Sequence, residues 1–444
     1  MNDTIYAIAS GFGRSSVCVV RLSGSKSGET AIRLAGRLPQ PRTFLLATLR
    51  DPRNGEIIDK GLVLWFPAPH SFTGEDVVEF QIHGGRAVVA ALFDALGACE
   101  GLRAANAGEF TRRALDHGKL DLAEVEGLAD LIDAETQAQR RQALRQMEGA
   151  LSHQAIEWRG KLLDALAFIE AEIDFVDERD VPPETSRLVD AIIGPLLVSL
   201  RRELAKGTAG ERIRDGFHIA LMGPPNAGKS TLLNVLAQRD IAIVSDLPGT
   251  TRDVIDVALD LGGYSVTLID TAGLRDSADP LEQMGMARAM QRGQGADLIL
   301  WLSEASTPSD PPPELTGAVW RIMTKIDRAE SLPAPAEDRE LEKTDTFFIS
   351  AATGYNLERL IAALKKFVDV QTIGAGEALI TRARHREAFE RAANALDHAM
   401  TRHLPIELMG EDLRHAAQAL QDITGCIGAE EILGEIFSRF CIGK

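Results

Sequence analysis

The sequence contains little cysteine. Only four cysteines occur among its 444 residues, and they are widely scattered, at Cys18, Cys99, Cys426 and Cys441. Because no two of them form a C-x-x-C pair, neither a zinc cage nor a disulfide framework is indicated. A reducing cytoplasm is therefore the expected compartment.

Long apolar runs are also missing. No stretch reaches the roughly 18 consecutive apolar residues that a membrane-spanning helix requires. The first ten residues, MNDTIYAIAS, lack the basic region and apolar core of a secretory signal, and they are not rich in arginine as a transit peptide would be. The sequence predicts no association with a membrane.

Basic residues are outnumbered by acidic ones. The 48 Lys and Arg residues stand against 65 Asp and Glu residues, which gives a formal net charge of −17. Non-specific binding to nucleic acid depends on clustered Lys and Arg. If the protein acts on a nucleic acid, we expect a partner to do much of the holding, although the charge alone also fits an ordinary acidic protein.

The positions of turn residues and the spacing of hydrophobic residues divide the chain into four segments. Residues 1–117 carry short β-rich runs, such as SSVCVVRLSG and EDVVEFQIHGG, and predict an α+β domain. Residues 118–213 and 369–444 have helical spacing, whereas residues 214–368 alternate strand and helix patterns and predict a parallel sheet. We interpret the two helical segments as one discontinuous domain with an α/β domain inserted, the alternative being two separate bundles.

The segment from Gly223 to Ser230 reads GPPNAGKS and matches the phosphate-loop pattern G-x-x-x-x-G-K-[ST]. An apolar strand pattern precedes it and a helix pattern follows, as such a loop requires. Lys229 is expected to reach the β- and γ-phosphates, and Ser230 to ligate Mg²⁺. The nucleotide contacts predicted here are Asn226, Ala227, Gly228, Lys229, Ser230 and Thr231.

Further nucleotide-binding motifs follow in the order expected of a Ras-like GTPase domain. GTTRD supplies a threonine, Thr251, for Mg²⁺, and DTAG follows a strand pattern with an Asp that orients the metal through water. The predicted contacts in these two segments are Ser245, Asp246, Leu247, Pro248, Gly249, Thr250 and Thr251, then Asp270, Thr271, Ala272 and Gly273.

Two later segments resemble the guanine-reading elements N-K-x-D and S-A-K. The predicted contacts are Thr324, Lys325 and Asp327, then Ser350, Ala351 and Ala352. Asp327 can accept hydrogen bonds from guanine N1–H and the 2-amino group, a donor pair that adenine lacks, so GTP is expected rather than ATP. Two departures stand out: Thr324 replaces the usual Asn, which predicts lower affinity, and Ala352 replaces the usual Lys while the Ala351 amide still meets O6.

The residues that would drive hydrolysis do not follow the Ras-like pattern. Leu274 stands where Ras-like enzymes place a water-orienting Gln. Asn226, together with the backbone carbonyls of Ser245, Leu247 and Thr250, is a candidate K⁺ site whose charge would replace that of an arginine finger. Glu282 either orients the attacking water or is a solvated carboxylate at a helix start. Arg252 and Arg275 are catalytic or switch-ordering candidates, or surface arginines.

Together these motifs resemble one family along essentially the whole chain. FTGED (72–76), HGG (83–85), GKLDLAEVEGLADLI (118–132), the nucleotide motifs and the terminal CIGK resemble the bacterial tRNA-modification GTPases of the MnmE (TrmE) family. The resemblance implies a folate-binding N-terminal domain that forms homodimers, and a G domain whose pairing depends on GTP and K⁺. It also implies an FAD-dependent partner, MnmG, with which a (carboxymethyl)aminomethyl group is built on the wobble uridine of certain tRNAs.

The resemblance also assigns a folate site. Glu79 matches the carboxylate that accepts the N3–H and 2-amino pair of a pterin, and Arg21 and Lys119 match its basic contacts, although each alone reads as a surface charge. The ligand implied is a 5-formyl- or 5,10-methylene-tetrahydrofolate. Lys444 is expected to contact it, and Cys441 is either a nucleophile near the one-carbon unit or a small buried residue.

Two other functions compete with this interpretation. A regulatory GTPase, for example in ribosome assembly, would carry a similar G domain, but the folate-like N-terminal domain and the terminal CIGK argue against it. The ending C-I-G-K has the spacing of a prenylation box. Lys is not a usual last residue of such a box and no polybasic stretch precedes it, so prenylation is not favoured.

Overall fold

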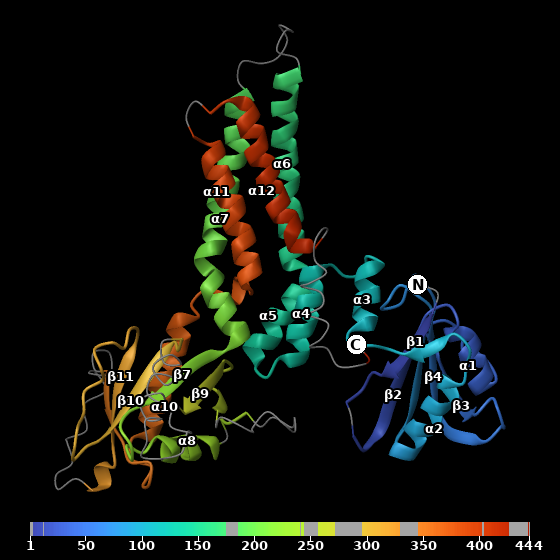
Figure 1. Ribbon diagram of the computed structural model, residues 1–444, viewed down its shortest axis with the longest axis horizontal. Coiled ribbons are helices and arrows are strands. Elements are labelled where there is room, and N and C mark those ends of the chain that lie inside the picture. The colour runs from blue at the N-terminus through green and yellow to red at the C-terminus, as the bar shows by residue number, and fades with distance from the viewer. Residues whose placement is uncertain are drawn as a thin grey trace, which may run out of the picture. The chain divides into compact units, whose positions relative to one another are not determined.

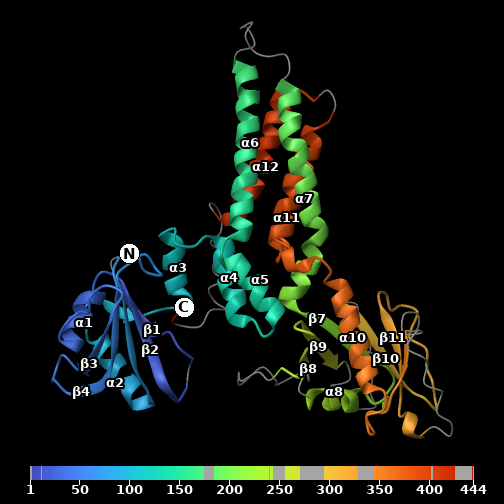
Figure 2. The same ribbon diagram turned by 180° about the vertical axis from the view of Figure 1, so that it is seen from behind.

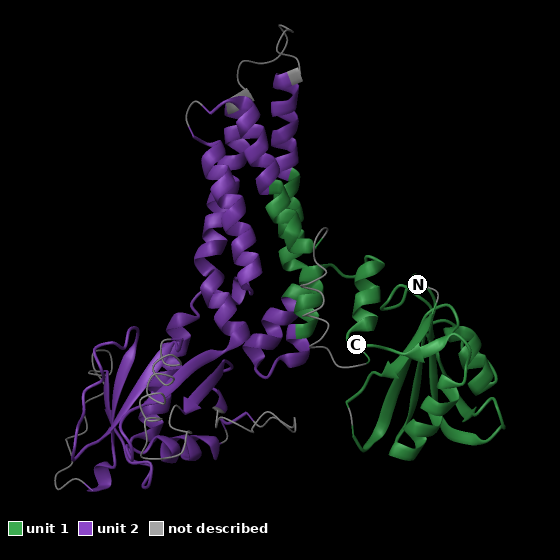
Figure 3. Ribbon diagram, viewed as in Figure 1, with its two compact units in different colours: residues 1–129, 146–160, 417–444 green, residues 130–145, 161–416 purple. Residues whose placement is uncertain are grey.

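The computed structural model describes residues 3–11, 13–174, 185–239, 241–243, 256–270, 295–328, 345–401, 404–425 and 443. It divides into two compact units, one of residues 1–129, 146–160 and 417–444 and one of residues 130–145 and 161–416 (Figure 3). Within the described residues, no helix combines the length and apolar character needed to cross a membrane.

The N-terminal part of the first unit is a six-stranded sheet with helices (Figure 1). Its elements are β1 (Thr4–Ile8), β2 (Ser15–Ser23), α1 (Ser27–Ala35), β3 (Phe44–Arg50), β4 (Ile57–Phe66), β5 (Val77–Gly84), α2 (Arg86–Gly97), β6 (Leu102–Ala104) and α3 (Glu109–Asp116). The strand order is β3-β4-β5-β2-β1-β6, and every pairing is antiparallel except that of β1 with β6. This confirms the predicted α+β domain.

Alternation along these strands explains how the sheet buries one face. In β4, Val63 and Trp65 are buried while their neighbours are partly exposed, and in β2 the same holds for Cys18 and Val20. Side chains alternate between the two faces of a strand, so these residues join one apolar core under α1 and α2. The buried face positions the polar residues of β2 and β5 on the opposite side.

Among the residues that the structure describes, the helical part of the chain consists of six helices. They are α4 (Leu122–Asp133), α5 (Gln137–Met147), α6 (Ala150–Asp174), α7 (Thr185–Asp215), α11 (Ala383–Ala399) and α12 (Ile406–Thr424). In both views α7 lies beside α11 and α6 beside α12 (Figures 1 and 2).

Ion pairs join the helices that precede the α/β domain to those that follow it. In the second unit, Arg386 on α11 pairs with Glu211 on α7 at 3.1 Å, and Arg414 on α12 pairs with Glu170 on α6 at 3.2 Å. Gly410 of α12 also lies against Ile169 of α6, where an added Cβ would be 3.2 Å from a side-chain carbon. The two helical segments therefore form one discontinuous domain, and the alternative of two separate bundles is wrong.

The inserted α/β domain is a second six-stranded sheet. It comprises β7 (Phe217–Met222), α8 (Lys229–Ala237), β8 (Asp256–Asp260), β9 (Ser265–Asp270), β10 (Leu298–Glu304), β11 (Val319–Thr324), the 3₁₀ turn η1 (Ile326–Arg328), β12 (Thr346–Phe348) and α10 (Leu357–Gln371). The order is β12-β11-β10-β7-β9-β8, parallel except for the antiparallel pairing of β8 with β9. The predicted Ras-like parallel sheet is confirmed.

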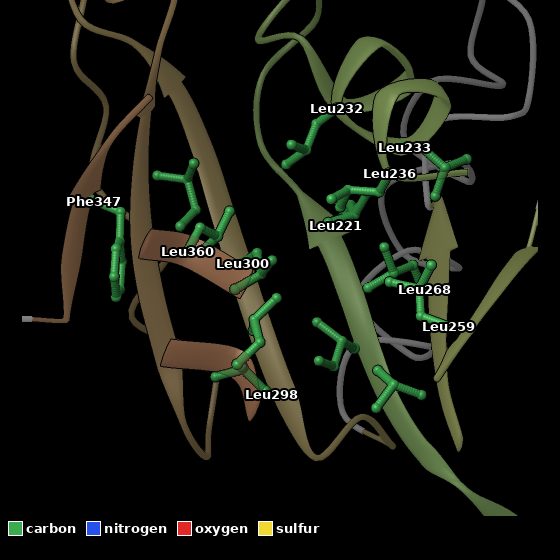
Figure 4. Close-up of a cluster of buried hydrophobic side chains, with 14 of the residues drawn as sticks. Leu221, Leu232, Leu233, Leu236, Leu259, Leu268, Leu298, Leu300, Phe347 and Leu360 are labelled. Carbon is green, nitrogen blue, oxygen red and sulfur yellow. The ribbon is translucent and has the colours of Figure 1, made fainter. Parts of the chain in front are cut away.

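Leucines fill the core between the sheet and its helices (Figure 4). Leu221 of β7, Leu268 of β9 and Leu300 of β10 are fully buried, as are Leu232 of α8 and Leu360 of α10. Because β7, β9, β10 and β11 are parallel, their carboxyl ends lie at one edge of the sheet, which is where ligands of open α/β sheets bind. The short 3₁₀ turn η3 (Ala375–Glu377) then leads to α11.

Candidate functional site

The phosphate loop runs from the end of β7 into α8, and its backbone has a conformation that its glycines make possible. Gly223 has φ of 141°, and a Cβ there would lie 2.0 Å from the carbonyl oxygen of Leu302. Asn226 and Gly228 also have positive φ, 60° and 94°. The loop therefore opens directly onto the N-terminus of α8, where backbone N–H groups favour an anion.

Lys229, the first residue of α8, folds back over this loop. Its ammonium donates to the carbonyl oxygens of Gly223 at 2.8 Å and Pro224 at 2.9 Å, and the side chain is 7 % exposed. Burial lowers the pKa of Lys229, while the charge of Asp270 acts in the opposite direction. A desolvated cation whose hydrogen bonds go to neutral carbonyls suits a phosphate group.

Ser230 and Asp270 meet at the same edge of the sheet. The Ser230 hydroxyl donates to Asp270 Oδ2 at 2.9 Å, and Asp270, the last residue of β9, is buried. Their proximity follows from the parallel pairing of β9 with β7, in which Asp270 stands opposite Leu221. A hydroxyl and a carboxylate together offer the hard oxygen ligands that Mg²⁺ prefers, so the two residues fit the predicted metal.

Thr324 braces the phosphate loop from the end of β11. Its hydroxyl lies 2.7 Å from the carbonyl oxygen of Ala227 and 3.2 Å from that of Ser303, and both groups are hydrogen-bond acceptors. The side chain is 4 % exposed. The contact to the loop is therefore present although Thr stands at a position where Asn is usual. The lower nucleotide affinity expected of this residue stays a prediction.

The predicted base-reading residues gather beside Thr324. Lys325 has φ of 56°, and its ammonium donates to Glu304 at 2.9 Å. This left-handed residue turns the chain into η1, where Asp327 is exposed and accepts a 2.6 Å hydrogen bond from the Ser350 hydroxyl. That bond lowers the pKa of Asp327 below its usual value. Of the two residues after Ser350, Ala351 is half-buried and Ala352 is exposed, and Thr231 is exposed on α8.

In the N-terminal domain the structure brings Arg21 and Glu79 together. They stand opposite one another in the pairing of β2 with β5, and Arg21 Nε donates to Glu79 Oε1 at 2.8 Å. The guanidinium lies 5.5 Å and 5.9 Å from the ring centroids of Phe72 and Phe110. A half-buried ion pair between two aromatic rings forms a mixed polar and apolar surface of the kind that a flat heterocycle requires.

Lys119 lies beside the FTGED segment that carries Phe72. A Cβ added at Gly74 would be 3.4 Å from Lys119 Cε, and the ring of His117 makes a 2.9 Å hydrogen bond with the carbonyl of Thr73. The Lys119 side chain is exposed. Two of the sequence motifs, FTGED and GKLDLAE, are thus packed against one another.

The N-terminal domain also holds a buried ionic cluster that was not predicted from the sequence pattern. Arg113 is 2 % exposed and donates to Glu75 at 2.9 Å and 3.1 Å, to Asp3 at 3.0 Å and to Glu109 at 3.2 Å. Burial alone would lower the pKa of Arg113, but its carboxylate partners raise it, so the guanidinium stays charged. The sequence feature that could have indicated this cluster is the i,i+4 spacing of Glu109 and Arg113 on α3, which allows an ion pair along a helix.

Gly443 is the described residue of the terminal CIGK motif. It is buried with φ of 111°, and a Cβ there would lie 1.7 Å from the carbonyl oxygen of Ile8, at the end of β1. Its neighbour in that strand, Ala7, pairs with Arg21 of β2. Within the first unit, the tail glycine therefore lies against the strand that borders Arg21, and only glycine fits this close approach.

Several predicted site residues lie outside the described residues. They are Ser245, Asp246, Leu247, Pro248, Gly249, Thr250, Thr251, Arg252, Thr271, Ala272, Gly273, Arg275, Glu282, Cys441 and Lys444. Their roles in metal binding, hydrolysis and folate binding stay predictions.

Comparison with known proteins gives matches along the whole chain. The family model "GTP-binding protein TrmE N-terminus" matches residues 4–119, and "MnmE helical domain" matches residues 122–441. The "tRNA modification GTPase MnmE" of Beijerinckia indica is 61% identical over 100% of this chain and 96% of its own length. That of Rhodopseudomonas palustris CGA009 is 50% identical over 100% of this chain and 99% of its own length.

Among solved structures, the G domain of the T. maritima FeoB iron transporter matches 34% of this chain and 98% of its own, with 25% sequence identity and a TM-score of 0.25.

Proposed function

The chain belongs to the family of tRNA modification GTPases named MnmE, and from that membership we infer that it hydrolyses GTP in the course of tRNA modification. The observation that carries this inference is the shared sheet edge at which phosphate and base contacts meet. Lys229 and Ser230 begin α8, and Thr324 at the end of β11 bonds the loop before them. Asp327 follows three residues later, where it can read guanine.

We assign different contacts with GTP to different described residues. The loop amides and Lys229 would hold the phosphates, and Asp327, kept ionised by Ser350, would accept the two donors of guanine. Ser230 would bind Mg²⁺, with Asp270 next to it, and the metal would offset charge on the β- and γ-phosphates. The Ala351 amide is proposed to meet the base oxygen O6.

We propose that hydrolysis depends on K⁺. Asn226 lies at the exposed tip of the phosphate loop, where its side-chain oxygen can face a cation beside the phosphates. The carbonyls of Ser245, Leu247 and Thr250 would complete that site, and Glu282 would orient the attacking water in the absence of a Gln at position 274. GTP hydrolysis should then be much faster in K⁺ than in Na⁺, and equal rates would remove the cation role from Asn226.

We further propose that the N-terminal domain binds a tetrahydrofolate derivative at Arg21, Glu79 and Lys119. Support comes from the pairing of Arg21 with Glu79 between two aromatic rings and from the position of Gly443 beside the adjoining strand. Lys444 would contact the ligand, and Cys441 would lie near its one-carbon unit. Glu79 Oε1 already accepts from Arg21, so a pterin must share this carboxylate or displace the guanidinium.

The proposed division of labour follows the segments 1–117, 118–213, 214–368 and 369–444. The first binds folate and forms the homodimer, the third is the G domain, and the second and fourth make the helical domain. The chain would act in the cytoplasm with the FAD-dependent partner MnmG on the wobble uridine of certain tRNAs. A net charge of −17 supports a division in which that partner holds most of the tRNA.

Complementation tests this function. A bacterial strain without its own MnmE would express the full chain, Lys229→Ala, or the control Lys365→Ala, which changes an exposed lysine of α10. Mass spectrometry of tRNA nucleosides should show the aminomethyl-type wobble uridines restored by the natural chain and the control but not by Lys229→Ala. Normal GTP hydrolysis with no restored nucleoside would instead favour a regulatory GTPase.

A further inference from the structure

The hydroxyl of Thr324 donates its one proton in a hydrogen bond within the protein. The side chain is buried, and Oγ1 lies 2.7 Å from the carbonyl oxygen of Ala227 and 3.2 Å from that of Ser303. A threonine hydroxyl carries one proton. Because both neighbours can only accept, that proton is directed at a backbone carbonyl, with the shorter contact to the phosphate loop.

On its Hoogsteen edge, guanine presents two hydrogen-bond acceptors, N7 and O6, and neither of these atoms carries a proton. A hydroxyl whose proton is already donated to Ala227 has only lone pairs left, and these do not bind another acceptor. An asparagine at this position would differ, because its two N–H donors can serve the loop carbonyl and a base nitrogen together.

Asp327 is suited to the Watson–Crick edge of guanine. It is exposed, and one of its oxygens accepts from Ser350 at 2.6 Å. A carboxylate has lone pairs for further donors, and guanine offers two donors, N1–H and the 2-amino group, on its Watson–Crick edge. The residues at the start and the end of the T-K-I-D segment are therefore suited to different tasks.

We propose that Thr324 is a positioning residue of the phosphate loop, and that this chain recognises guanine at its Watson–Crick edge through Asp327 without reading N7 through residue 324. The chain therefore accepts guanine nucleotides in which carbon replaces N7. This inference rests on the proposed GTP function. Thr324 also lies against the loop glycine before Lys229, since a Cβ on Gly228 would be 3.7 Å from Oγ1.

Competition binding tests the proposal. The full chain is loaded with a fluorescent N-methylanthraniloyl GDP, which is then displaced by GDP, 7-deaza-GDP or ADP. For the natural chain, GDP and 7-deaza-GDP should bind within about twofold of each other, since no hydrogen bond to N7 is lost. A preference for GDP of tenfold or more would overturn the proposal.

Three substitutions separate bracing from base reading. Thr324→Val keeps the shape but leaves the Ala227 carbonyl without its donor, so GDP and 7-deaza-GDP should both weaken by about tenfold. Thr324→Ser should restore both affinities. Thr324→Asn adds a free donor and should create a preference of about tenfold for GDP over 7-deaza-GDP.

Two outcomes contradict the proposal in different ways. If Thr324→Val changes the ratio of GDP to 7-deaza-GDP affinity, residue 324 reads N7 and the proposal is wrong. If the natural chain binds ADP as tightly as GDP, guanine is not read at all, and the proposed GTP function itself fails.

Discussion

The phosphate loop and the Arg21–Glu79 pair are assembled in different ways. The loop is one contiguous stretch, and its shape follows from positive φ at Gly223 and Gly228 and from the start of α8 directly behind them. Arg21 and Glu79 are 58 residues apart in sequence and meet only because β2 pairs with β5 in one register. Local chemistry therefore specifies the first site, whereas tertiary pairing specifies the second.

The two sites also differ in the groups that neutralise their positive charges. Lys229 is buried and donates to neutral carbonyls, which leaves its positive charge available to a phosphate. Arg21 is paired with the carboxylate of Glu79, and Arg113 in the same domain is paired with three carboxylates. A phosphate at the first site would provide the negative charge that Lys229 lacks among its partners. A pterin at the second site would have to compete with Arg21 for the Glu79 carboxylate.

The largest expected effect concerns the buried cluster. Arg113→Met should lower the free energy of unfolding of the N-terminal domain by about 3–5 kcal/mol, because it leaves the largely buried Glu75 without its cation and removes one of the two arginines that pair with buried Glu109. Urea denaturation of the full chain measures this. The control Arg112→Met changes an exposed neighbour on α3. GTP hydrolysis should remain normal in both, and a loss no larger than that of the control would contradict the account.

Lys229→Ala should have the next largest effect. GTP hydrolysis should fall by about 10²- to 10³-fold, because a pre-positioned charge that stabilises the phosphates is removed. Turnover measured at saturating GTP checks this, with Lys365→Ala as the matched control. Folate binding should be unchanged in both variants. A turnover close to that of the control would show that the loop amides suffice without the ammonium.

Glu79→Gln is expected to weaken binding of 5-formyltetrahydrofolate by about 10- to 100-fold, since a charge-assisted acceptor becomes a neutral amide and Arg21 loses its partner. Titration calorimetry of the full chain measures the affinity. Glu29→Gln, an exposed carboxylate on α1, is the control. The same affinity in both variants would remove Glu79 from the folate site.

The smallest expected effect is a dependence of stability on pH. Burial would raise the pKa of Glu109, but hydrogen bonds from Arg103 and the Asn106 amide lower it below the usual 4.5. A carboxylate with a depressed pKa stabilises the fold above its unfolded pKa, and this contribution is lost as pH falls through the folded value. Stability of the N-terminal domain should therefore fall below about pH 4.5.

Urea midpoints between pH 7 and pH 3 measure this dependence. Arg103→Met should make the dependence shallower, because it removes the first hydrogen-bond donor to Glu109. A domain whose stability rises as the pH falls would show that the cluster is not ionised as described.

Most of the fold could be predicted from hydrophobic period and turn residues. The change from strand patterns to helical spacing near residue 118, and back again near residue 214, matches the observed order of elements. Helix α1 was not predicted, and the union of the two helical segments was only one of two interpretations. That union depends on contacts such as Arg386 with Glu211, 175 residues apart, which no local pattern encodes.

The candidate sites were predictable to the extent that they are local. Gly223 to Ser230 could be assigned from the motif and its flanking patterns, and Thr324 and Asp327 could be assigned as nucleotide contacts from the T-K-I-D segment, whereas the hydrogen bond of Thr324 to the phosphate loop was seen only in the structure. Arg21 and Glu79 needed the family resemblance, since each alone looks like a surface charge. Nothing local showed that Asp3 and Glu75 meet at Arg113, which is separated from them by 110 and 38 residues.

The central claim is that the edge formed by the loops after β7 and β11 is a GTP site in which Asp327 reads the base. Competition of GTP with XTP for the natural chain and for Asp327→Asn tests it most directly. The natural chain should prefer GTP, and the variant should prefer XTP, because the amide of Asn donates to the oxygen at C2 of xanthine. An unchanged preference for GTP in the variant would contradict the account.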